Sequence, residues 1–358
     1  MRIVLFIGFL RGLNLLKRVL ERGESVIGVF VYEEDAHERT KYAADIESLC
    51  QANQIPVKKT RKINNGQARE IETKFAPDVI FCCGWRSLFP DEILTAARYG
   101  VVGAHDSLLP RLRGFAPTNW ALLLGKDEVG VTLFRMTPGV DRGDIFFQQS
   151  ISVSPADPLS QITDQIALLA VDLFDKYLDA VSDGTLTAIP QAHEQATYGC
   201  ARIPEDGEID WSATSIAIVR LVRAVGPPGP GAFTYYNRSI IKILKATAVD
   251  APFHYEGRIP GRIVNISTGS VDVLSGDGVV RIDEVESDSN GVCAPTEIFK
   301  SVRTQLGIRA STEIARLYAI IADLEKSNVQ MQERLERLEA EFRRLAIPEH
   351  SCRGGQSQ

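Results

Sequence analysis

Residues 101–144 have the sequence VVGAHDSLLPRLRGFAPTNWALLLGKDEVGVTLFRMTPGVDRGD. His105 stands where an apolar, strand-like run gives way to a loop, and Asp141 stands in the glycine-bounded turn GVDRGD. A histidine at the carboxyl end of a strand and a carboxylate on a neighbouring turn suit a general acid/base and its partner. In such a pair the carboxylate fixes the histidine tautomer and favours its charged form. We take His105 and Asp141 as the candidate catalytic pair.

The chain before this stretch alternates short apolar runs with segments of helical spacing. RIVLFIGF (2–9) and SVIGVFVY (25–32) are apolar runs, and RGLNLLKRVLERG (11–23) between them has a helical period. The pattern continues through DVIFCCG (78–84) to the run that ends at His105. This alternation predicts a parallel sheet with helices on its faces, in which ligands bind beyond the carboxyl ends of the strands.

The second half of the chain predicts a further domain. A hairpin strand at 146–153 and an amphipathic helix at 162–181 complete the first domain, and residues 184–203 have no periodicity, which indicates a linker. A helix over 209–225 precedes short alternating strands separated by turns such as STGS and SGDG, typical of a small β-barrel or meander. We expect domains at 1–190 and 200–290, a helix at 313–347 and a disordered tail at 348–358.

Composition limits the class of protein. Forty basic and 46 acidic residues give a formal charge of −6, which makes a nucleic-acid partner unlikely. No run approaches the roughly 20 apolar residues of a membrane helix, and the chain starts directly with a strand, so we expect no membrane association and a cytoplasmic location. The six cysteines lack paired metal spacing, so we expect reduced thiols and no metal. Gly8 and Gly12 lack the third glycine of a dinucleotide fingerprint.

Several motifs occur in a recognisable order: GWRSLFP, HDSLLPRLRG, RGFAPTNWAL, the GVDRGD turn, and RIPEDGEIDW leading to GAFTYY. With them, roughly the first 285 residues resemble the folate-dependent formyltransferases, the family of methionyl-tRNA formyltransferase and the sugar N-formyltransferases. The first three look most like the branch that formylates amino sugars on nucleotide carriers. The resemblance implies an α/β fold: a Rossmann-like domain followed by a small OB-like β-barrel domain.

The resemblance also implies 10-formyltetrahydrofolate as cosubstrate, with His105 and Asp141 as two of three polar catalytic residues. The residues expected to bind the folate are Trp85, Arg86, Leu88, Phe89, Leu108, Leu109, Pro110 and Asp144. The residues expected to bind the acceptor are Arg111, Arg113, Thr118 and Asn119. Aromatic side chains after a strand are as often core, and the two arginines fit a solvated loop equally well.

Position 103 departs from the family pattern, because Gly103 stands where the family has its third polar residue, an asparagine. Loss of one oxyanion donor typically costs about a hundred- to a thousand-fold in rate. Our reading is an active transferase acting on a nucleotide-linked amino sugar, with the donor replaced by backbone N–H groups of residues 104–107, a water or Asn119. Formylation of methionyl-tRNA, disfavoured by the acidic segment at 32–45, and hydrolysis to formate are alternatives. A catalytically impaired binding or assembly protein is the alternative outside enzymes.

The final helix has a coiled-coil pattern. Its apolar positions alternate spacings of three and four: Ile314, Leu317, Ile321, Leu324, Asn328, Met331, Leu335, Leu338, Phe342 and Leu345. In this register Asn328 is an a position, Arg334 a g position and Glu339 the following e position. We therefore expect a homodimer through residues 313–347, with packing against its own chain as the alternative.

Overall fold

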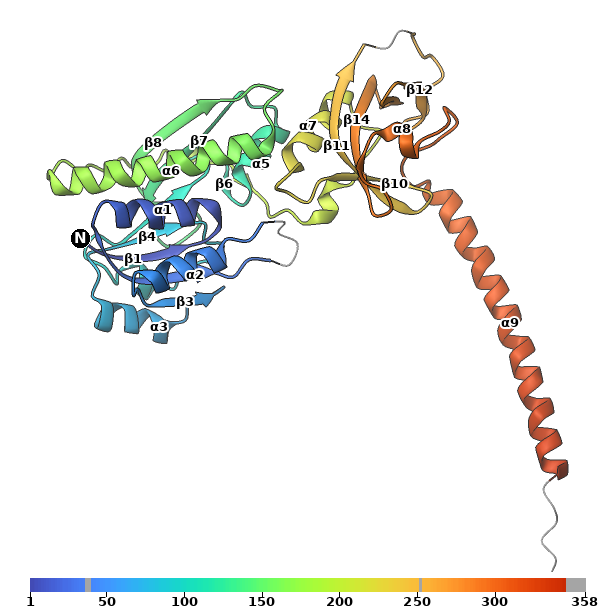
Figure 1. Cartoon of the computed structure of the whole chain (residues 1–358), viewed down its shortest axis with the longest axis horizontal. Helices are drawn as coiled ribbons and strands as arrows, with labels where there is room; N and C mark the ends of the chain where they lie inside the picture. The colour runs from blue at the N-terminus through green and yellow to red at the C-terminus, as the bar shows by residue number, and fades with distance from the viewer. Residues whose placement is uncertain (36–39, 251–252, 346–358) are drawn as a thin grey trace, which may run out of the picture. The chain divides into compact units, whose positions relative to one another are not determined.

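The structure is a computed structural model that describes residues 1–35, 40–250 and 253–345. It divides into two compact units, residues 1–307 and 308–358 (Figure 1). Among the described residues, the first unit contains two large sheets and one two-stranded sheet, and the second contains the helix α9, Ala310–Leu345. The tail expected at 348–358, and the last two positions of the helix expected at 313–347, lie outside the described residues.

A seven-stranded sheet forms the amino-terminal half of the first unit, in the order β3-β2-β1-β4-β5-β7-β8. The first five of these strands are parallel, and β7 and β8 are antiparallel additions. This confirms the predicted α/β fold. The strands are β1 (Arg2–Ile7), β2 (Ser25–Tyr32), β3 (Val57–Thr60), β4 (Val79–Cys83), β5 (Val101–His105), β7 (Glu128–Arg135) and β8 (Ile145–Ser152).

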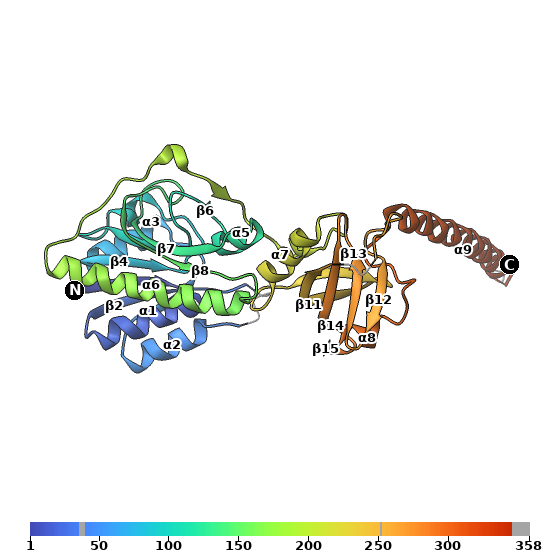
Figure 2. The same cartoon turned by 90° about the horizontal axis from the view of Figure 1, so that it is seen from above.

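Helices cover both faces of this sheet (Figure 2). One face carries α1, α2 and α6, and the other carries α3 with a π-helical turn, followed by α4. Arg18 on α1 forms an ion pair with Asp175 on α6, so the two helices are also tied at the surface. The helices are α1 (Phe9–Glu21), α2 (Ala43–Ala52), α3 (Asn65–Glu70), η1 (Ile71–Phe75), α4 (Asp91–Leu94), α5 (Pro117–Leu123) and α6 (Leu159–Ser182).

The strand order changes direction between β1 and β4, the point where open α/β sheets bind ligands. Two glycines let the ends of these strands meet. A Cβ at Gly84 would lie 2.4 Å from the carbonyl oxygen of Gly8, and Gly84 has φ +81°, a conformation that suits glycine. The amide of Gly8 donates to the carbonyl of Cys83 at 3.1 Å. The ends of β1 and β4 are thus held in close backbone contact at the switch point.

A second, six-stranded antiparallel sheet follows, in the order β10-β11-β14-β13-β12 with β15 beside β14. Its core includes Phe299 and Leu306, so the domain continues past the end expected at 290. The elements are α7 (Ser215–Val225), β10 (Ala232–Tyr236), β11 (Ser239–Val249), β12 (Ile263–Ser267), β13 (Ser270–Leu274), β14 (Val279–Ser287), β15 (Gly291–Cys293) and α8 (Pro295–Ile298).

One predicted helix start was wrong, and one connecting segment contains short elements. The helix expected over 209–225 begins only at Ser215, because Thr214 caps it by accepting from the amide of Ala217 at 3.2 Å. Trp211 lies before the helix instead, buried, with its indole N–H donating to the hydroxyl of Thr234 at 2.9 Å. The segment predicted as a linker, 184–203, contains short elements: η2 (His193–Gln195) is a 3₁₀ turn, and β9 (Tyr198–Gly199) pairs in parallel with β6 (Arg113–Gly114). A second 3₁₀ turn, η3 (Pro204–Gly207), follows this segment.

Candidate functional site

The structure brings His105 and Asp141 together at the carboxyl end of β5. The Nδ1 atom of His105 lies 3.5 Å from Oδ2 of Asp141, and the side chains are 11% and 18% exposed. The same carboxylate oxygen accepts from the amide of Gly114 at 2.8 Å. Asp141 has φ +49°, in the left-handed region, which aims its side chain back toward the histidine loop at a backbone cost. The pair is therefore largely buried and held from both sides.

A backbone carbonyl, rather than the carboxylate, fixes the tautomer of His105. Its Nε2 atom lies 2.8 Å from the carbonyl oxygen of Leu112, and because a carbonyl only accepts, Nε2 carries the proton. Leu112 has φ +53°, and its amide donates to the hydroxyl of Thr197 at 2.9 Å. Nδ1, the other ring nitrogen, faces the carboxylate of Asp141.

Gly103 lies two residues before the histidine on the same face of β5. A Cβ at this position would stand 3.0 Å from both Cγ and Sδ of Met136, and 3.1 Å from the ring of Phe134. The side-chain space beside Gly103 is therefore already occupied. Asn119, the side chain considered as a replacement donor, donates its amide to the carbonyl of Ala224 at 2.6 Å. This bond links α5 to α7.

Gln191, which sequence reasoning missed, ties the turn that carries Asp141 to the segment after β5. Its amide donates to the carbonyls of Asp141 at 2.9 Å and Gly143 at 2.6 Å. Its oxygen accepts from the guanidinium of Arg113, with distances of 2.6 and 3.2 Å. Arg113 is buried and also contacts Nδ1 of His193 at 2.9 Å, so it braces this segment. Nothing in the non-periodic sequence around Gln191 signals this role.

The residues expected to bind folate after β4 form an aromatic cluster. Trp85 stacks on Phe89 with ring centroids 5.8 Å apart, and both rings meet Phe6 edge to face. The indole N–H of Trp85 is buried without a hydrogen-bond acceptor among the described residues. Arg86 lies over the ring of Phe9, 4.3 Å from its centroid, and Leu88 is exposed. Trp85 and Phe89 thus pack against the core on the α3 face of the sheet, with one buried donor unsatisfied among the described residues.

The other expected site residues lie around the loop after β5. Leu109 is buried, and its amide donates to the hydroxyl of Thr132 at 3.0 Å, whereas Leu108 and Pro110 are half-buried. The carbonyl of Asp144 accepts from the amide of Arg135 at 2.8 Å, which closes the hairpin that holds Asp141. Arg111 is exposed and Thr118 is buried at the start of α5.

A partly buried ion pair adjoins His105 and was not anticipated from the sequence. Arg11 on α1 pairs with Asp106, whose second carboxylate oxygen is buried without a partner among the described residues. Burial lowers the pKa of the Arg11 guanidinium and raises the pKa of the Cys83 thiol to about 11. The pair fixes the backbone that follows His105 against α1.

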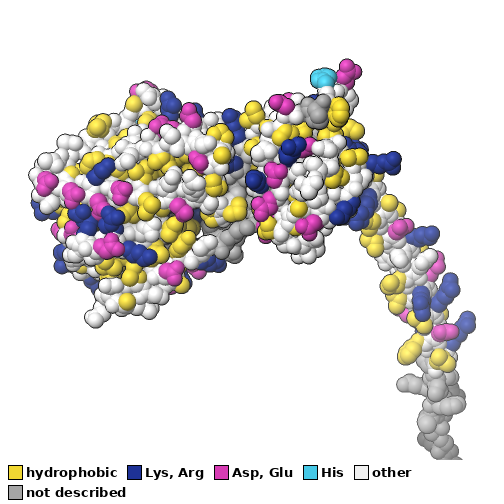
Figure 3. All heavy atoms as spheres, turned by 45° about the horizontal axis from the view of Figure 1, so that its top comes forward, with side chains coloured by type: hydrophobic (Ala, Val, Ile, Leu, Met, Phe, Trp, Pro, Cys, Tyr) yellow, Lys and Arg dark blue, Asp and Glu magenta, His cyan; other side chains and the backbone are white. Residues whose placement is uncertain are grey.

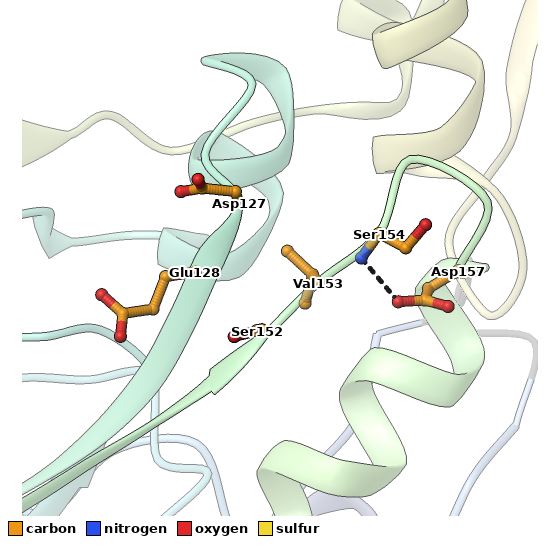
Figure 4. A pocket seen from close by; sticks show the side chains of 6 residues that line it. All are labelled: Asp127, Glu128, Ser152, Val153, Ser154 and Asp157. Atoms are coloured by element: carbon orange, nitrogen blue, oxygen red, sulfur yellow. Dashed lines mark hydrogen bonds between the residues drawn. The ribbon is translucent and has the colours of Figure 1, made fainter.

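A surface pocket lies where β7 begins and β8 ends, and neither His105 nor Asp141 lines it (Figure 4). Asp127, Glu128 and Asp157 line it, and the amide of Ser154 donates to Asp157 at 2.7 Å. Across residues 1–35, 40–250 and 253–345, no group of three or more His, Cys, Asp or Glu side chains is arranged to hold a metal ion. No helix within these ranges is both long enough and apolar enough to cross a membrane.

Comparison with known proteins gives the family. The family model described as "Formyl transferase" matches residues 2–177, and the one described as "Formyl transferase, C-terminal domain" matches residues 203–303. The methionyl-tRNA formyltransferase of Geobacter metallireducens is 30% identical over 296 residues, which is 82% of this chain and 93% of that protein.

Solved structures share the fold. An N-formyltransferase from Helicobacter canadensis, in complex with folinic acid and dTDP-3-aminofucose, superposes with a TM-score of 0.61 at 18% identity, covering 80% of this chain and 99% of that one. HypX from Aquifex aeolicus, in complex with tetrahydrofolic acid, has a TM-score of 0.55 at 17% identity over 84% of this chain. This chain spans only 47% of HypX. Both family models match this chain in the expected order, and the Geobacter metallireducens relative is 30% identical over 82% of it. The chain therefore belongs to the folate-dependent formyltransferase family of enzymes.

Proposed function

We propose that this enzyme moves the formyl group of 10-formyltetrahydrofolate to the amine of a nucleotide-linked amino sugar, with His105 and Asp141 as its catalytic pair. The observation that carries the proposal is the facing imidazole and carboxylate, 3.5 Å apart and largely buried beyond β5. The attacking amine must lose a proton as its nitrogen bonds to the formyl carbon. Nδ1 of His105 accepts that proton, and Asp141 stabilises the imidazolium until the proton passes to the departing folate nitrogen.

The folate is proposed to bind against the aromatic cluster at the switch point. Trp85 and Phe89 offer apolar ring faces, and the unsatisfied indole N–H of Trp85 would gain an acceptor from a polar heterocycle. The folinic acid bound by the Helicobacter canadensis enzyme supports a folate of this kind. Trp85 and Phe89 are thus proposed for the cosubstrate together with Leu108, Leu109 and Pro110, which leaves Arg111, later in the loop after β5, for the acceptor.

An amino-sugar acceptor is favoured by the charges after β2. Glu33 is exposed there, and Asp35 pairs with Arg61 at 2.9 Å and with Arg86 at 3.2 Å. Because these arginines are already paired with carboxylates, the segment offers little free positive charge to a long phosphate backbone. One exposed arginine, Arg111, is enough to meet a small diphosphate. The dTDP-3-aminofucose held by the Helicobacter canadensis enzyme gives further support.

Formylation of methionyl-tRNA is the second candidate, favoured by the Geobacter metallireducens relative and its 93% coverage. To separate the two, the purified protein is incubated with 10-formyltetrahydrofolate and either a panel of nucleotide-linked amino sugars or initiator methionyl-tRNA. Formylated product is then measured by mass spectrometry. We expect a formylated sugar. Product on methionyl-tRNA alone would replace the sugar proposal, and formate released without an acceptor would indicate a hydrolase.

We also propose the cytoplasmic location expected from the sequence. Cys50, Cys82, Cys83, Cys200 and Cys293 are all free thiols, as suits a reducing compartment.

A further inference from the structure

Helix α9 exposes a continuous apolar stripe. We call it the α9 seam, and its members are Ile314, Leu317, Ile321, Leu324, Asn328, Met331, Leu335, Leu338, Phe342 and Leu345. Each apolar member is at least 49% exposed within the unit formed by residues 308–358. Figure 3 shows hydrophobic side chains along the helix between charged ones. A stripe of this length in water indicates a surface that is covered in the working protein.

We propose that the α9 seam pairs with the same seam of a second copy of this chain, as a parallel, in-register, two-stranded coiled coil. The inference rests on α9 alone and is independent of the proposed function. The seam alternates spacings of three and four over five heptads, the repeat of a left-handed coiled coil.

The residue types at the two core positions favour two strands. Two of the five a positions, Ile314 and Ile321, are β-branched, and the other three are Asn328, Leu335 and Phe342. Every d position but Met331 is leucine. Isoleucine at a with leucine at d is the combination that favours a parallel dimer over trimers and tetramers. The central a position is Asn328, and a single buried asparagine at a specifies register and strand number at a cost in stability.

The polar residues decide the direction of the second helix. In a parallel dimer Asn328 meets Asn328 of the other copy, and the amides can bond each other. Arg334 at g then flanks Glu339 at e of the other copy, giving one attractive pair on each side. With the full seam overlapped in antiparallel order, Asn328 instead faces Met331, and Arg334 flanks Ser327. The antiparallel pairing therefore buries an amide against a thioether and forms no such ion pair.

The outer face of α9 is suited to solvent. The f positions opposite the seam are Ala319, Lys326, Glu333 and Ala340. Surface ion pairs run along the helix, including Glu333 with Arg337 at 3.9 Å and Glu339 with Arg343 at 3.6 Å. The α9 seam is therefore the one face of the helix that needs to be covered, and a second helix in a coiled coil covers a stripe of this width.

Sedimentation of the full chain tests the pairing. Wild type is compared with Leu324→Asp/Leu335→Asp, which places two charges in the seam, and with Ala319→Asp/Ala340→Asp, which places the same charges on the outer face. We expect twice the 39.4 kDa monomer mass for wild type and the outer-face variant, and the monomer mass for the seam variant. A monomeric wild type, a trimeric or larger wild type, or a seam variant that remains dimeric would overturn the proposal.

Cross-linking tests the direction. Ile321→Cys is compared with Ala319→Cys, which carries the same native cysteines and a new thiol on the outer face. In a parallel dimer the two new thiols at 321 adjoin, whereas in the antiparallel overlap residue 321 faces residue 338, about 25 Å from its own counterpart at 1.5 Å per residue. We expect a disulfide-linked dimer from Ile321→Cys and none from Ala319→Cys beyond the wild-type level. A sedimenting dimer of Ile321→Cys that does not cross-link would overturn the parallel arrangement.

Discussion

Met136 lies where a side chain on residue 103 would project, with its Cγ and Sδ each 3.0 Å from the Cβ that Gly103 lacks. The family pattern has an asparagine at this position. In this chain the asparagine side chain is absent, and Met136 fills the space that it would occupy. Met136 follows β7 directly, and its amide donates to the carbonyl of Val101 at 2.8 Å, which holds its backbone beside β5. The site thus accommodates a glycine by packing a thioether over it, and the oxyanion must be held by other groups.

Gly103→Asn is expected to lower formyl transfer or leave it unchanged, because the new side chain must displace Met136. Overpacking of this kind typically costs about 1–3 kcal/mol of stability, measurable by urea unfolding. Met136→Ala in the same background should relieve the crowding and recover the stability, with Met136→Ala alone as the control. If wild type is inactive and the Gly103→Asn/Met136→Ala protein transfers formyl groups, the protein is an impaired relative and our active reading fails.

Gln191→Leu is expected to destabilise the protein, because it strips the buried guanidinium of Arg113 of its acceptor and the carbonyl of Asp141 of its donor. Each buried polar group left unsatisfied costs about 1–3 kcal/mol, and charged groups cost more. The matched control is Gln195→Leu, an exposed glutamine four residues away that should be near neutral. Urea unfolding of both variants measures the effect. Equal stability of the two proteins would show that the Gln191 contacts contribute nothing.

Thiol labelling of the native protein at pH 8 is expected to modify Cys200 well before Cys50, Cys82 and Cys83. Burial raises the pKa of Cys50 and of Cys83 to about 11, and raises the pKa of Cys82 as well. A thiol whose pKa lies above the working pH is mostly protonated, and the protonated form does not react. Cys200 is exposed. Peptide mapping after iodoacetamide treatment identifies the modified sites, and rapid native labelling of Cys82 or Cys83 would contradict the buried β4.

The fold was largely predictable because its signals are local. Apolar runs alternating with helical periods predict the parallel sheet, and they place His105 at the end of β5, where the structure has it. The start of α7 was not predictable from periodicity, since Thr214 caps the helix and Trp211 turns into the neighbouring core. The spacing of apolar residues over 209–225 is the same whether Trp211 belongs to the helix or packs into the core before it.

The site was predictable only in part, because its support comes from residues distant in sequence. The proximity of His105 and Asp141 follows from the hairpin that returns beside β5. The Leu112 carbonyl that sets the tautomer, the Met136 side chain over Gly103 and the Gln191 brace leave no mark on any sequence pattern. These contacts arise from loop conformation and side-chain packing, which periodicity does not encode.

The central claim is that His105 moves the proton in formyl transfer. The most direct measurement is single-turnover transfer from 10-formyltetrahydrofolate to the best acceptor by wild type, His105→Asn and His254→Asn, where His254 is exposed in the second domain. Loss of a general acid/base typically costs about 10² to 10⁴ in rate, so we expect a fall in this range for His105→Asn with folate affinity retained, and a wild-type rate for His254→Asn. A folded His105→Asn protein that keeps a tenth or more of the wild-type rate would contradict the account.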